Sequence, residues 1–387
     1  MTTPPSGERD TLADRVAYRT RYVDDPLALL EKILAKTVVP YQVEAQPGRL
    51  QGRELCWMPC PYCYGGSSKN TGERLTPDRY QEIIRQTAKG PHGGVDKVIY
   101  AGYATDPLNY ERIDDLVDTS IELGQVIGVH SKLLRVSDRL VELLTRPGNR
   151  GTNYITVSLD AGTTDSYNLT HGIPGRADLY GKVIENLARL RRRRDDRGAT
   201  LDITTNYLVT RVNNDSTVVE KAITDIIGAG VDSIRFSFPQ VPRGMDSVNG
   251  TILPTRAEVE QIHRRLAPVI ASFAAERTKV LLLDYDGEQR IDEARSLPCF
   301  ARFIYPAIAY DGFLSNCSQS AAPQFRDMAL GNLATVDFWD AFYDYDAADF
   351  WGFLDGQHRK MTSNDCRCDR KEHTVNRIFR RAVARPA

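Results

Sequence analysis

The sequence predicts an α/β protein, with a partial (β/α)6 TIM-like barrel followed by a small C-terminal α+β domain. Between about residues 50 and 240, short β-rich runs alternate with helical patterns, and five such repeats close on a sixth strand. This order favours a parallel sheet with right-handed crossovers. Further along, Asp311-Gly312 lies between two apolar runs and is a strong signal for a tight hairpin, which indicates a different C-terminal architecture.

The expected elements follow from runs of apolar residues and from helix start signals. Thr76-Pro77 and Asn214-Asp215-Ser216 supply cap and first-turn residues for two of the helices. The six expected strands are Leu50–Leu55, Lys97–Gly102, Val126–His130, Tyr154–Leu159, Leu201–Val209 and Ser233–Phe238. The five expected helices are Pro77–Ala88, Glu111–Leu123, Ser137–Leu144, Gly181–Arg194 and Asp215–Gly228.

We expect four segments along the chain. Residues 1–49 form an N-terminal extension, and residues 50–245 form the barrel. Residues 246–296 are a linker segment with a helix near Arg256–Arg277 and a strand near Lys279–Tyr285, and Gln240–Pro254 is expected to connect it to the barrel. Residues 297–387 form the C-terminal domain.

Composition excludes several classes of function. The net charge is −1 with 26% charged residues, so bulk electrostatics predict no nucleic-acid partner and no membrane surface. No apolar stretch is long enough to cross a membrane, and the N-terminus carries no signal-peptide core. The seven cysteines are an odd number, which suits metal ligation in a reducing, cytoplasmic setting better than paired disulfides.

The most informative feature is the C-x3-C-x2-C spacing of Cys56, Cys60 and Cys63. Three thiolates this close can hold a cubane iron–sulfur cluster, and one iron then has no protein ligand and is open to chemistry. The alternatives are a zinc knuckle or buried thiols in a non-catalytic protein with structural metal sites. His92 and His130 are the nearest histidines in sequence that would close such a zinc site.

This spacing, with Tyr62 just before the third cysteine, resembles the radical S-adenosylmethionine (SAM) enzymes. The resemblance implies a [4Fe–4S] cluster on Cys56, Cys60 and Cys63, whose open iron binds SAM, and it places Tyr62 against the adenine. It also implies reduction of SAM to methionine and a 5′-deoxyadenosyl radical, which removes a hydrogen atom from the substrate. An external donor of the flavodoxin or ferredoxin type would supply the electron.

Two further motifs extend the resemblance. Gly102 and Asp106 lie where the family has its Gly-Gly-Glu-Pro-type motif after the second strand, although this chain keeps one glycine and has aspartate in place of glutamate. Ser158 lies where a serine of the fourth strand reaches the ribose in the family. We expect Asp160 to share its face, because side chains two apart on a strand point the same way. Asp160 would bind ribose or substrate, or cap the following helix.

Three more residues are candidates on the same resemblance. His171 lies where members often have an arginine near the SAM carboxylate. Asn206 on the fifth strand and Arg235 on the sixth lie where family members hold adenine and substrate. Arg235 suits an anionic group, because its guanidinium stays charged; the alternative is a buried structural pair.

A second cysteine set lies near the C-terminus and resembles the twitch or SPASM-type extension of some radical SAM enzymes. The resemblance implies an auxiliary [4Fe–4S] cluster on four ligands, a number that suits the shorter twitch form. A tetrahedral zinc ion uses the same ligands. The four residues are Cys299, Cys317, Cys366 and Cys368.

The two sets use all seven cysteines, so no thiol remains to quench a substrate radical, although a tyrosine could do so. A net oxidation or oxidative bond formation, with the auxiliary cluster accepting an electron, therefore fits better than thiol-quenched epimerisation. We expect a small metabolite, such as a sugar, aminocyclitol or nucleoside-like intermediate of a biosynthetic pathway. The alternative is a peptide that is cross-linked or epimerised; residues 1–49 are short and polar for a leader-binding domain.

Overall fold

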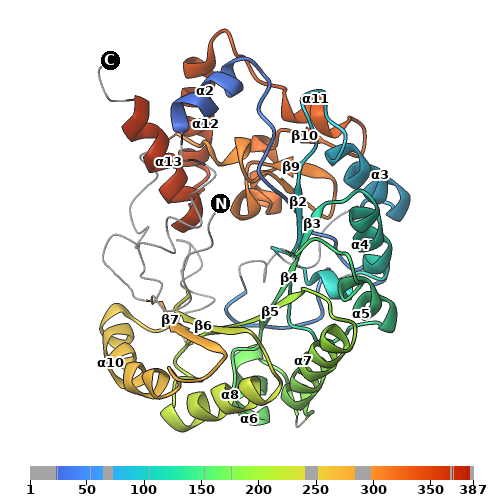
Figure 1. Ribbon diagram of the computed structural model, residues 1–387. Coiled ribbons are helices and arrows are strands. Elements are labelled where there is room, and N and C mark those ends of the chain that lie inside the picture. Colours follow the sequence, from blue (N-terminus) through green and yellow to red (C-terminus); the bar gives the residue numbers. More distant parts are fainter. Residues whose placement is uncertain are drawn as a thin grey trace.

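The computed structural model contains one mixed sheet of ten strands in the order β10-β9-β8-β1-β2-β3-β4-β5-β6-β7. The sheet curves, and the helices that connect its strands lie on its outer side (Figure 1). The structure describes residue 23 and residues 25–52, 54–63, 73–103, 105–151, 153–175, 177–239, 252–283, 298–366, 368 and 370–383.

Seven consecutive strands are parallel, which confirms the partial TIM-like barrel and adds a seventh strand to the six expected. They are β1 (Val43–Ala45), β2 (Lys97–Tyr100), β3 (Val126–Ser131), β4 (Tyr154–Ser158), β5 (Asp202–Leu208), β6 (Ser233–Ser237) and β7 (Lys279–Leu282). The seventh strand is the one expected in the linker segment, and it pairs with β6.

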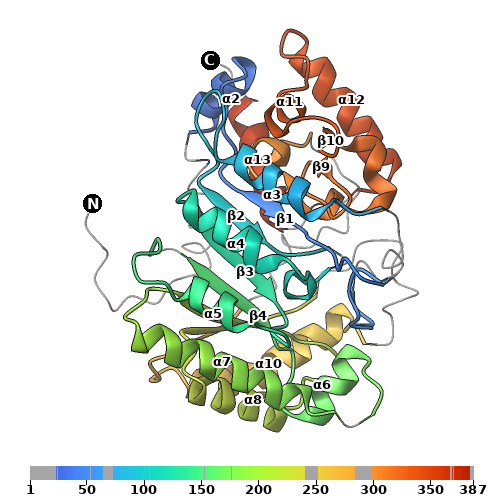
Figure 2. The same cartoon turned by 90° about the vertical axis from the view of Figure 1, so that its right-hand side faces the viewer.

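Helices between the strands cover the outer face of the sheet (Figure 2). They are α3 (Pro77–Thr87), α4 (Ile113–Glu122), α5 (Asp138–Leu144), α6 (Thr164–His171), α7 (Leu179–Asp196), α8 (Ser216–Gly228) and α10 (Arg256–Ser272). Of these, α6 was not expected from the sequence. The other α-helices among the described residues are α2 (Pro26–Leu34), α11 (Phe338–Phe342), α12 (Phe350–Ser363) and α13 (Arg370–Val383).

The expected helix starts are confirmed. The Thr76 side chain accepts a hydrogen bond from the Arg79 backbone at 3.3 Å, and Pro77 takes the first helical position of α3. Asp215 accepts from the Thr217 backbone at 2.9 Å at the start of α8. Each side chain satisfies a backbone N–H group that the helix itself leaves without a partner.

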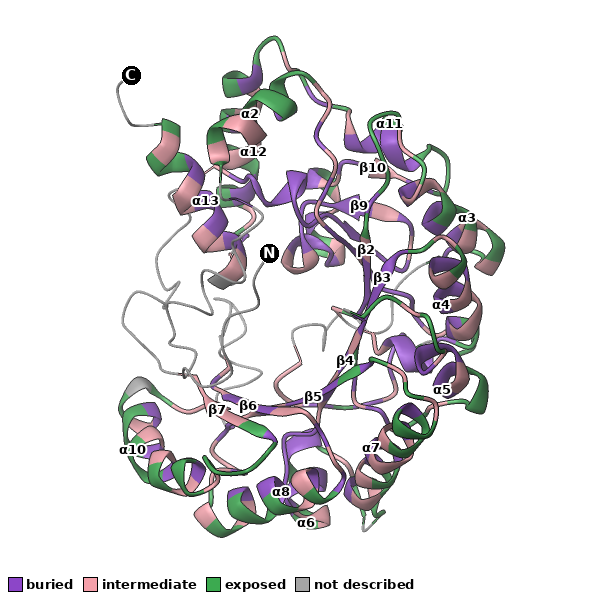
Figure 3. Ribbon diagram, viewed as in Figure 1, coloured by how far each residue is buried: buried purple, intermediate pink, exposed green. Residues whose placement is uncertain are grey.

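The core lies between the sheet and the outer helices, where Figure 3 shows the buried residues concentrated. Apolar side chains from neighbouring strands are fully buried there and form one cluster with the helices. Strand residues of this cluster include Val98, Ile127, Val129, Ile155, Val157, Ile203 and Ile234. The core fixes the strands, and therefore also the loops that follow their carboxyl ends.

The expected first strand, Leu50–Leu55, is wrong. The first strand is β1, which lies within the segment expected to precede the barrel. At residues 49–55 the chain turns back on itself, because the Arg49 N–H donates to the Leu55 carbonyl at 3.3 Å and Gly52 has a φ of 81°. Glycine is the residue that adopts this left-handed conformation without strain, so an extended strand is interrupted there.

The C-terminal segment continues the barrel sheet. β8 (Ala307–Ile308) pairs in parallel with β1, while β9 (Phe313–Ser315) and β10 (Gly331–Asn332) are antiparallel additions. The hairpin expected at Asp311-Gly312 is confirmed and joins β8 to β9. Most of the expected connection Gln240–Pro254, and Tyr285 at the end of the expected strand, lie outside the described residues. In the described part of the chain, every helix is too short or too polar for a membrane span.

Glu258 provides a pH-dependent link between the barrel and α10. Its carboxylate accepts bonds from Arg211 at 2.8 Å and from the Thr255 backbone at 2.6 Å, and these bonds lower its pKa from 4.5 to about 2. The folded pKa lies below the unfolded one, so the stabilisation is complete above about pH 4.5 and is lost as the pH falls toward 2. We expect Glu258→Gln to unfold at a midpoint that depends less on pH in this window, measured by urea denaturation. An unchanged pH dependence would contradict this role.

Candidate active site

The N-terminal cysteine loop is folded against the end of α6. Cys56 and Cys60 are buried and Cys63 is half-buried, and the Cys63 N–H donates to the Cys60 carbonyl at 3.1 Å. A Cβ atom at Gly172, which ends α6, would lie 3.0 Å from the Pro59 carbonyl oxygen. The loop therefore rests closely on this helix end.

Two of the three sulfurs have polar neighbours from distant parts of the chain. The Asn109 amide lies 3.7 Å from Cys56 Sγ, and Trp57 Nε1 holds that amide by donating to its oxygen at 3.1 Å. His171 Nδ1 lies 3.5 Å from Cys60 Sγ. The Asn109 amide is a hydrogen-bond donor, and donors of this kind orient ligand sulfurs and tune the potential of an iron–sulfur centre.

Tyr62, between two of the cysteines, is the centre of a buried polar network. Its hydroxyl lies 2.8 Å from Asp160 Oδ2, 2.9 Å from Lys132 Nζ and 3.0 Å from His171 Nδ1. Lys132 Nζ also pairs with Asp160 Oδ2 at 3.3 Å. Lys132 and Asp160 follow the carboxyl ends of β3 and β4, where parallel strands place their working residues. The network ties the cysteine loop to the barrel.

Burial and charge fix the protonation states in this network. Burial, then the charges of Asp160 and Cys60, raise the pKa of Tyr62, so its hydroxyl keeps its proton. Burial alone would lower the pKa of Lys132, but the charges of Asp160 and Cys60 outweigh it and raise the pKa. Burial and then the positive charge of Lys132 hold the pKa of His171 well below 6.5. The imidazole is therefore neutral; its Nε2 lies 3.3 Å from the carbonyl of Leu159, so Nδ1 is the acceptor.

Asp160 does not continue the alternation of β4. The strand ends at Ser158, and Asp160 has a φ of 56°, so the expectation that the two side chains share a strand face is wrong. Its second oxygen, Oδ1, accepts from the Leu208 N–H at 2.7 Å, and its carbonyl accepts from Asn213 at 2.8 Å. These bonds hold a left-handed backbone that is costly for a non-glycine residue. Ser158 remains half-buried at the strand end.

The loop after β2 brings Gly102 and Asp106 to the same edge of the sheet. A Cβ atom at Gly102 would lie 2.3 Å from the Thr105 carbonyl oxygen, so the turn requires glycine. The Asp106 carboxylate accepts from Ser131 Oγ at 2.7 Å and from the Lys132 N–H at 2.9 Å. It therefore positions the residue that contacts Tyr62.

Asn206 and Arg235 meet on the two neighbouring strands β5 and β6. Arg235 Nε donates to Asn206 Oδ1 at 3.1 Å, and Ser237 Oγ lies 3.4 Å from the same oxygen. Tyr207 is fully buried, and its ring lies 4.9 Å from that of Phe236. Asn206, Arg235 and Ser237 are half-buried, as expected for side chains on the opposite face from the core.

The C-terminal cysteines also come together from distant segments. Cys299 precedes the turn η5 (Ala301–Phe303), Cys317 follows β9, and Cys366 connects α12 to α13. All three are buried. Burial first, then the charges of Glu372, Cys299 and Cys366, raise the pKa of the Cys317 thiol well above 9.0.

Cys368 is joined to the same region by Asn376 on α13. The Asn376 amide donates to Cys368 Sγ at 3.4 Å, and its oxygen accepts from the Phe300 N–H at 2.8 Å. Phe300 directly follows Cys299, so the side chain of Asn376 connects the cysteine at one end of the set with the cysteine at the other.

The donor sets fit iron–sulfur clusters in their chemistry: five buried and two half-buried thiols, with hydrogen-bond donors directed at Cys56 and Cys368. In the described residues, no three histidine, cysteine, aspartate or glutamate side chains converge on a point for one metal ion. In a cubane cluster each thiolate binds a different iron, so its ligands surround the cluster and do not converge on one point.

Sequence reasoning missed Lys132; it named His171 as a candidate site residue, and His92 and His130 as the histidines nearest to the cysteines in sequence. His171, 111 positions from Cys60, is the histidine at its sulfur. His130 instead lies 3.1 Å from the Tyr154 hydroxyl, and the His92 ring packs against Tyr343. The position of Lys132, directly after the third strand, was the available signal, because strand ends carry the working residues in barrels.

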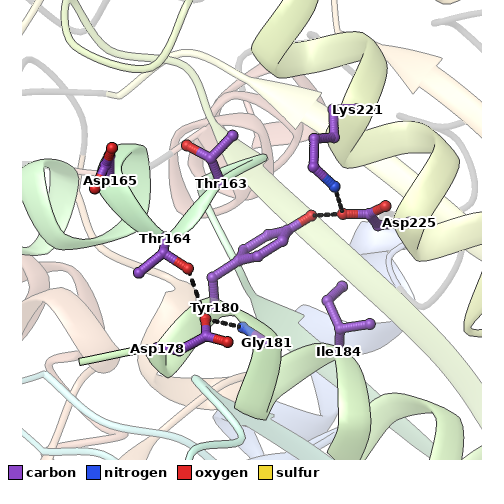
Figure 4. Close-up of a pocket in the computed structure, with 9 residues that line it drawn as sticks. All are labelled: Thr163, Thr164, Asp165, Asp178, Tyr180, Gly181, Ile184, Lys221 and Asp225. Atoms are coloured by element: carbon purple, nitrogen blue, oxygen red, sulfur yellow. Dashed lines mark hydrogen bonds and ion pairs between the residues drawn. The ribbon is translucent and has the colours of Figure 1, made fainter. Parts of the chain in front are cut away.

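A separate surface pocket of about 560 Å³ lies among α6, α7 and α8 (Figure 4). Its polar groups bind one another: the Tyr180 hydroxyl donates to Asp225 at 2.8 Å, and Thr164 donates to Asp178 at 2.6 Å. The cysteines and the Tyr62 network are not part of its lining. It is lined by Thr163, Thr164, Asp165, Asp178, Tyr180, Gly181, Ile184, Lys221 and Asp225.

Comparison with known families bears directly on the cysteine loop. Residues 54–223 match the model of the Radical SAM superfamily. This segment is a radical SAM superfamily domain. The domain includes the three N-terminal cysteines, Lys132, Asp160 and His171, so the buried network belongs to it. No curated protein matches the sequence significantly.

Solved structures share the fold of this chain over most of its length. SuiB of Streptococcus suis bound to S-adenosylmethionine is 15% identical, with a TM-score of 0.58 over 86% of this chain and 72% of SuiB. SuiB bound to its precursor peptide SuiA is 15% identical, with a TM-score of 0.57 over 89% of this chain and 73% of SuiB. At this identity the similarity shows the fold alone.

Proposed function

We propose that this protein is a radical SAM enzyme that removes a hydrogen atom from a small metabolite and completes a net oxidation or rearrangement in a biosynthetic pathway. The radical SAM domain implies an enzyme with a [4Fe–4S] cluster and SAM. The observation that carries the proposal is the cysteine loop anchored through Tyr62 to the carboxyl-terminal edge of the sheet.

In this proposal Cys56, Cys60 and Cys63 hold the cluster. When bound, the cluster and SAM supply a 5′-deoxyadenosyl radical that abstracts the substrate hydrogen. The contribution of the protein is position and shielding. Lys132 and Asp160 fix Tyr62, and Tyr62 fixes the loop between the second and third ligands.

We assign further contacts to the half-buried residues at the same edge. Because Gly102 has no side chain, the backbone there would approach the SAM amino group closely, beside Asp106. Ser158, at the end of β4, would contact the ribose. Asn206 and Arg235 would hold adenine or an anionic group of the substrate. The Asp160 carboxylate already accepts hydrogen bonds from the Tyr62 hydroxyl and the Leu208 N–H and pairs with Lys132. These interactions support a positioning role for Asp160.

The first experiment is the metal content of protein purified and reconstituted without oxygen, followed by a SAM-cleavage assay with a chemical reductant. About eight irons per chain and 5′-deoxyadenosine formation support two cubane clusters and the proposed chemistry. About four irons with one zinc would keep the radical chemistry and make the C-terminal site structural. Zinc without iron would instead favour a non-catalytic protein with structural metal sites.

A peptide substrate is the second candidate. The observation that favours it is the fold similarity to SuiB, which was solved with a precursor peptide. The two candidate substrate classes, metabolite and peptide, are distinguished by incubating the reconstituted enzyme and SAM with a candidate peptide or with metabolite pools. Changes in mass are then followed. A SAM-dependent mass change confined to the peptide would overturn the metabolite proposal.

We also propose that an external flavodoxin- or ferredoxin-type protein reduces the N-terminal cluster in a reducing cytoplasm. The seven free thiols support this setting, because thiolate ligands and iron–sulfur clusters are stable where thiols stay reduced. Replacing the chemical reductant with such a protein should sustain SAM cleavage. No cleavage with any such donor would contradict the assignment.

Cys317→Ala tests the role of the auxiliary cluster. We expect the iron content to fall from about eight to about four while SAM cleavage continues, because the radical SAM cluster keeps its three ligands. Product formation should stop, since the electron released from the substrate radical has no acceptor. Full product formation by this variant would make the C-terminal cluster purely structural.

A further inference from the structure

Tyr167 on α6 is a buried residue that no sequence motif singles out. Its side chain is 0% exposed, and its hydroxyl has no hydrogen-bond partner among the described residues. Burial is the main cause that raises the pKa of Tyr167, so the hydroxyl keeps its proton and is able to donate. A buried hydroxyl without a partner is costly, so we expect an acceptor that a bound group supplies.

Tyr167 shares the face of α6 that contacts the cysteine loop. It lies one helical turn before His171, and the centroids of the two rings are 4.3 Å apart. His171 Nδ1 in turn lies 3.5 Å from Cys60 Sγ and 3.0 Å from the Tyr62 hydroxyl. The tyrosine ring is therefore packed on the imidazole that contacts this loop. In agreement with this position, the charges of Lys132 and Cys60 are the largest that act on the Tyr167 hydroxyl.

The acceptors that this loop would bring are sulfur atoms. A [4Fe–4S] cluster held by the three cysteines carries negatively charged thiolate and sulfide sulfurs, which accept hydrogen bonds. His171 is not a donor toward them, because its Nε2 lies 3.3 Å from the Leu159 carbonyl and Nδ1 then carries no proton. The Tyr167 hydroxyl is uncharged and keeps its proton, so it suits an anionic acceptor.

We propose that the Tyr167 hydroxyl donates a hydrogen bond to a sulfur of the N-terminal cluster on its Cys60 side, and that this bond raises the reduction potential of the cluster. The inference rests on the N-terminal cluster of the proposed function and adds a residue to its surroundings. A donor at a sulfur stabilises the reduced cluster more than the oxidised one, because the reduced cluster carries one more negative charge.

Tyr167→Phe tests the proposal, because it removes the hydroxyl and keeps the ring that packs on His171. In the reconstituted full-length chain, the N-terminal cluster is identified by the electron paramagnetic resonance signal that changes when SAM binds its open iron. The midpoint potential of this signal is then measured without SAM. We expect the iron content of the parent, and an equilibrium constant for one-electron reduction about tenfold lower, which corresponds to about 59 mV.

Asn109→Leu is the reference variant, since it removes a donor that lies 3.7 Å from Cys56 Sγ. It should also lower the potential of the N-terminal cluster. The matched control is Tyr100→Phe. Tyr100 is likewise 0% exposed, but its hydroxyl donates to the Leu116 carbonyl at 2.7 Å. Tyr100→Phe should leave the potential unchanged.

Urea denaturation of the metal-free protein gives a second measurement, which does not depend on the cluster. Here Tyr167→Phe removes a hydroxyl that has no partner, so its urea midpoint should equal or exceed that of the parent. Tyr100→Phe breaks a buried hydrogen bond and should lower the midpoint. An equal loss in the two variants would show that the Tyr167 hydroxyl already has a protein partner, and would overturn the proposal.

The outcomes separate this inference from the proposed function. If the parent binds no iron–sulfur cluster, the proposed function is wrong and the inference is wrong with it. If the parent binds the cluster and Asn109→Leu lowers its potential, but Tyr167→Phe keeps the parent potential and spectrum, only the role of Tyr167 is overturned. A lower potential in Tyr167→Phe, with the parent potential in Tyr100→Phe, supports the inference.

Discussion

Cys56→Ala is expected to abolish the reductive cleavage of SAM. Two thiolates cannot hold a cubane cluster with a single open iron, so the N-terminal cluster is lost or misassembled. Cys56 is buried beside the Asn109 amide, and alanine leaves that donor without a sulfur acceptor. The measurement is 5′-deoxyadenosine formation by the reconstituted variant under reducing conditions, together with its iron content.

The matched control is Cys317→Ala, which also removes one buried thiol but leaves the N-terminal loop intact. It should cleave SAM at close to the parent rate. If Cys56→Ala retained parent-level cleavage, Cys56 would not be a ligand of the catalytic cluster, and the assignment of the C-x3-C-x2-C motif would be wrong.

Lys132→Met is expected to destabilise the metal-free protein by about 3–5 kcal/mol, since it leaves a buried charge without its partner. The side chains of Lys132 and Asp160 are only 15% and 3% exposed, and their charged atoms are 3.3 Å apart. Lys132 also donates to the Tyr62 hydroxyl, so the cysteine loop loses one of its anchors. The free energy of unfolding is measured by urea denaturation at pH 7.

Two further variants make this test specific. Adding Asp160→Asn to Lys132→Met removes the uncompensated charge but keeps an oxygen for the Leu208 N–H, so the double variant should regain about 1–3 kcal/mol of the loss. Lys182→Met removes a lysine from an exposed pair with Glu185 and should change stability by less than about 0.5 kcal/mol. Strictly additive losses in the double variant would show that Lys132 and Asp160 do not interact.

Much of the barrel could be predicted from the sequence. Alternating apolar runs and helix caps such as Thr76 and Asp215 are local signals, and the elements they predict are present. The first strand was misplaced, because the turn at Gly52 depends on contacts that fold residues 49–55 back on themselves. A three-residue strand such as β1 also carries too little periodicity to be recognised by itself.

The candidate site, like the barrel, could be predicted from the sequence only in part. The sequence by itself predicts Cys56, Cys60 and Cys63 as cluster ligands, because the C-x3-C-x2-C spacing keeps three thiols close along the chain. Only the tertiary structure decided what surrounds them: Lys132, Asp160 and His171 lie 70, 98 and 109 positions from the tyrosine that they contact. Such contacts depend on how parallel strands bring their carboxyl ends to one edge, and on burial, which makes each charge require a partner. Neither the arrangement of the strands nor the burial of a side chain can be read from the spacing of residues along the chain.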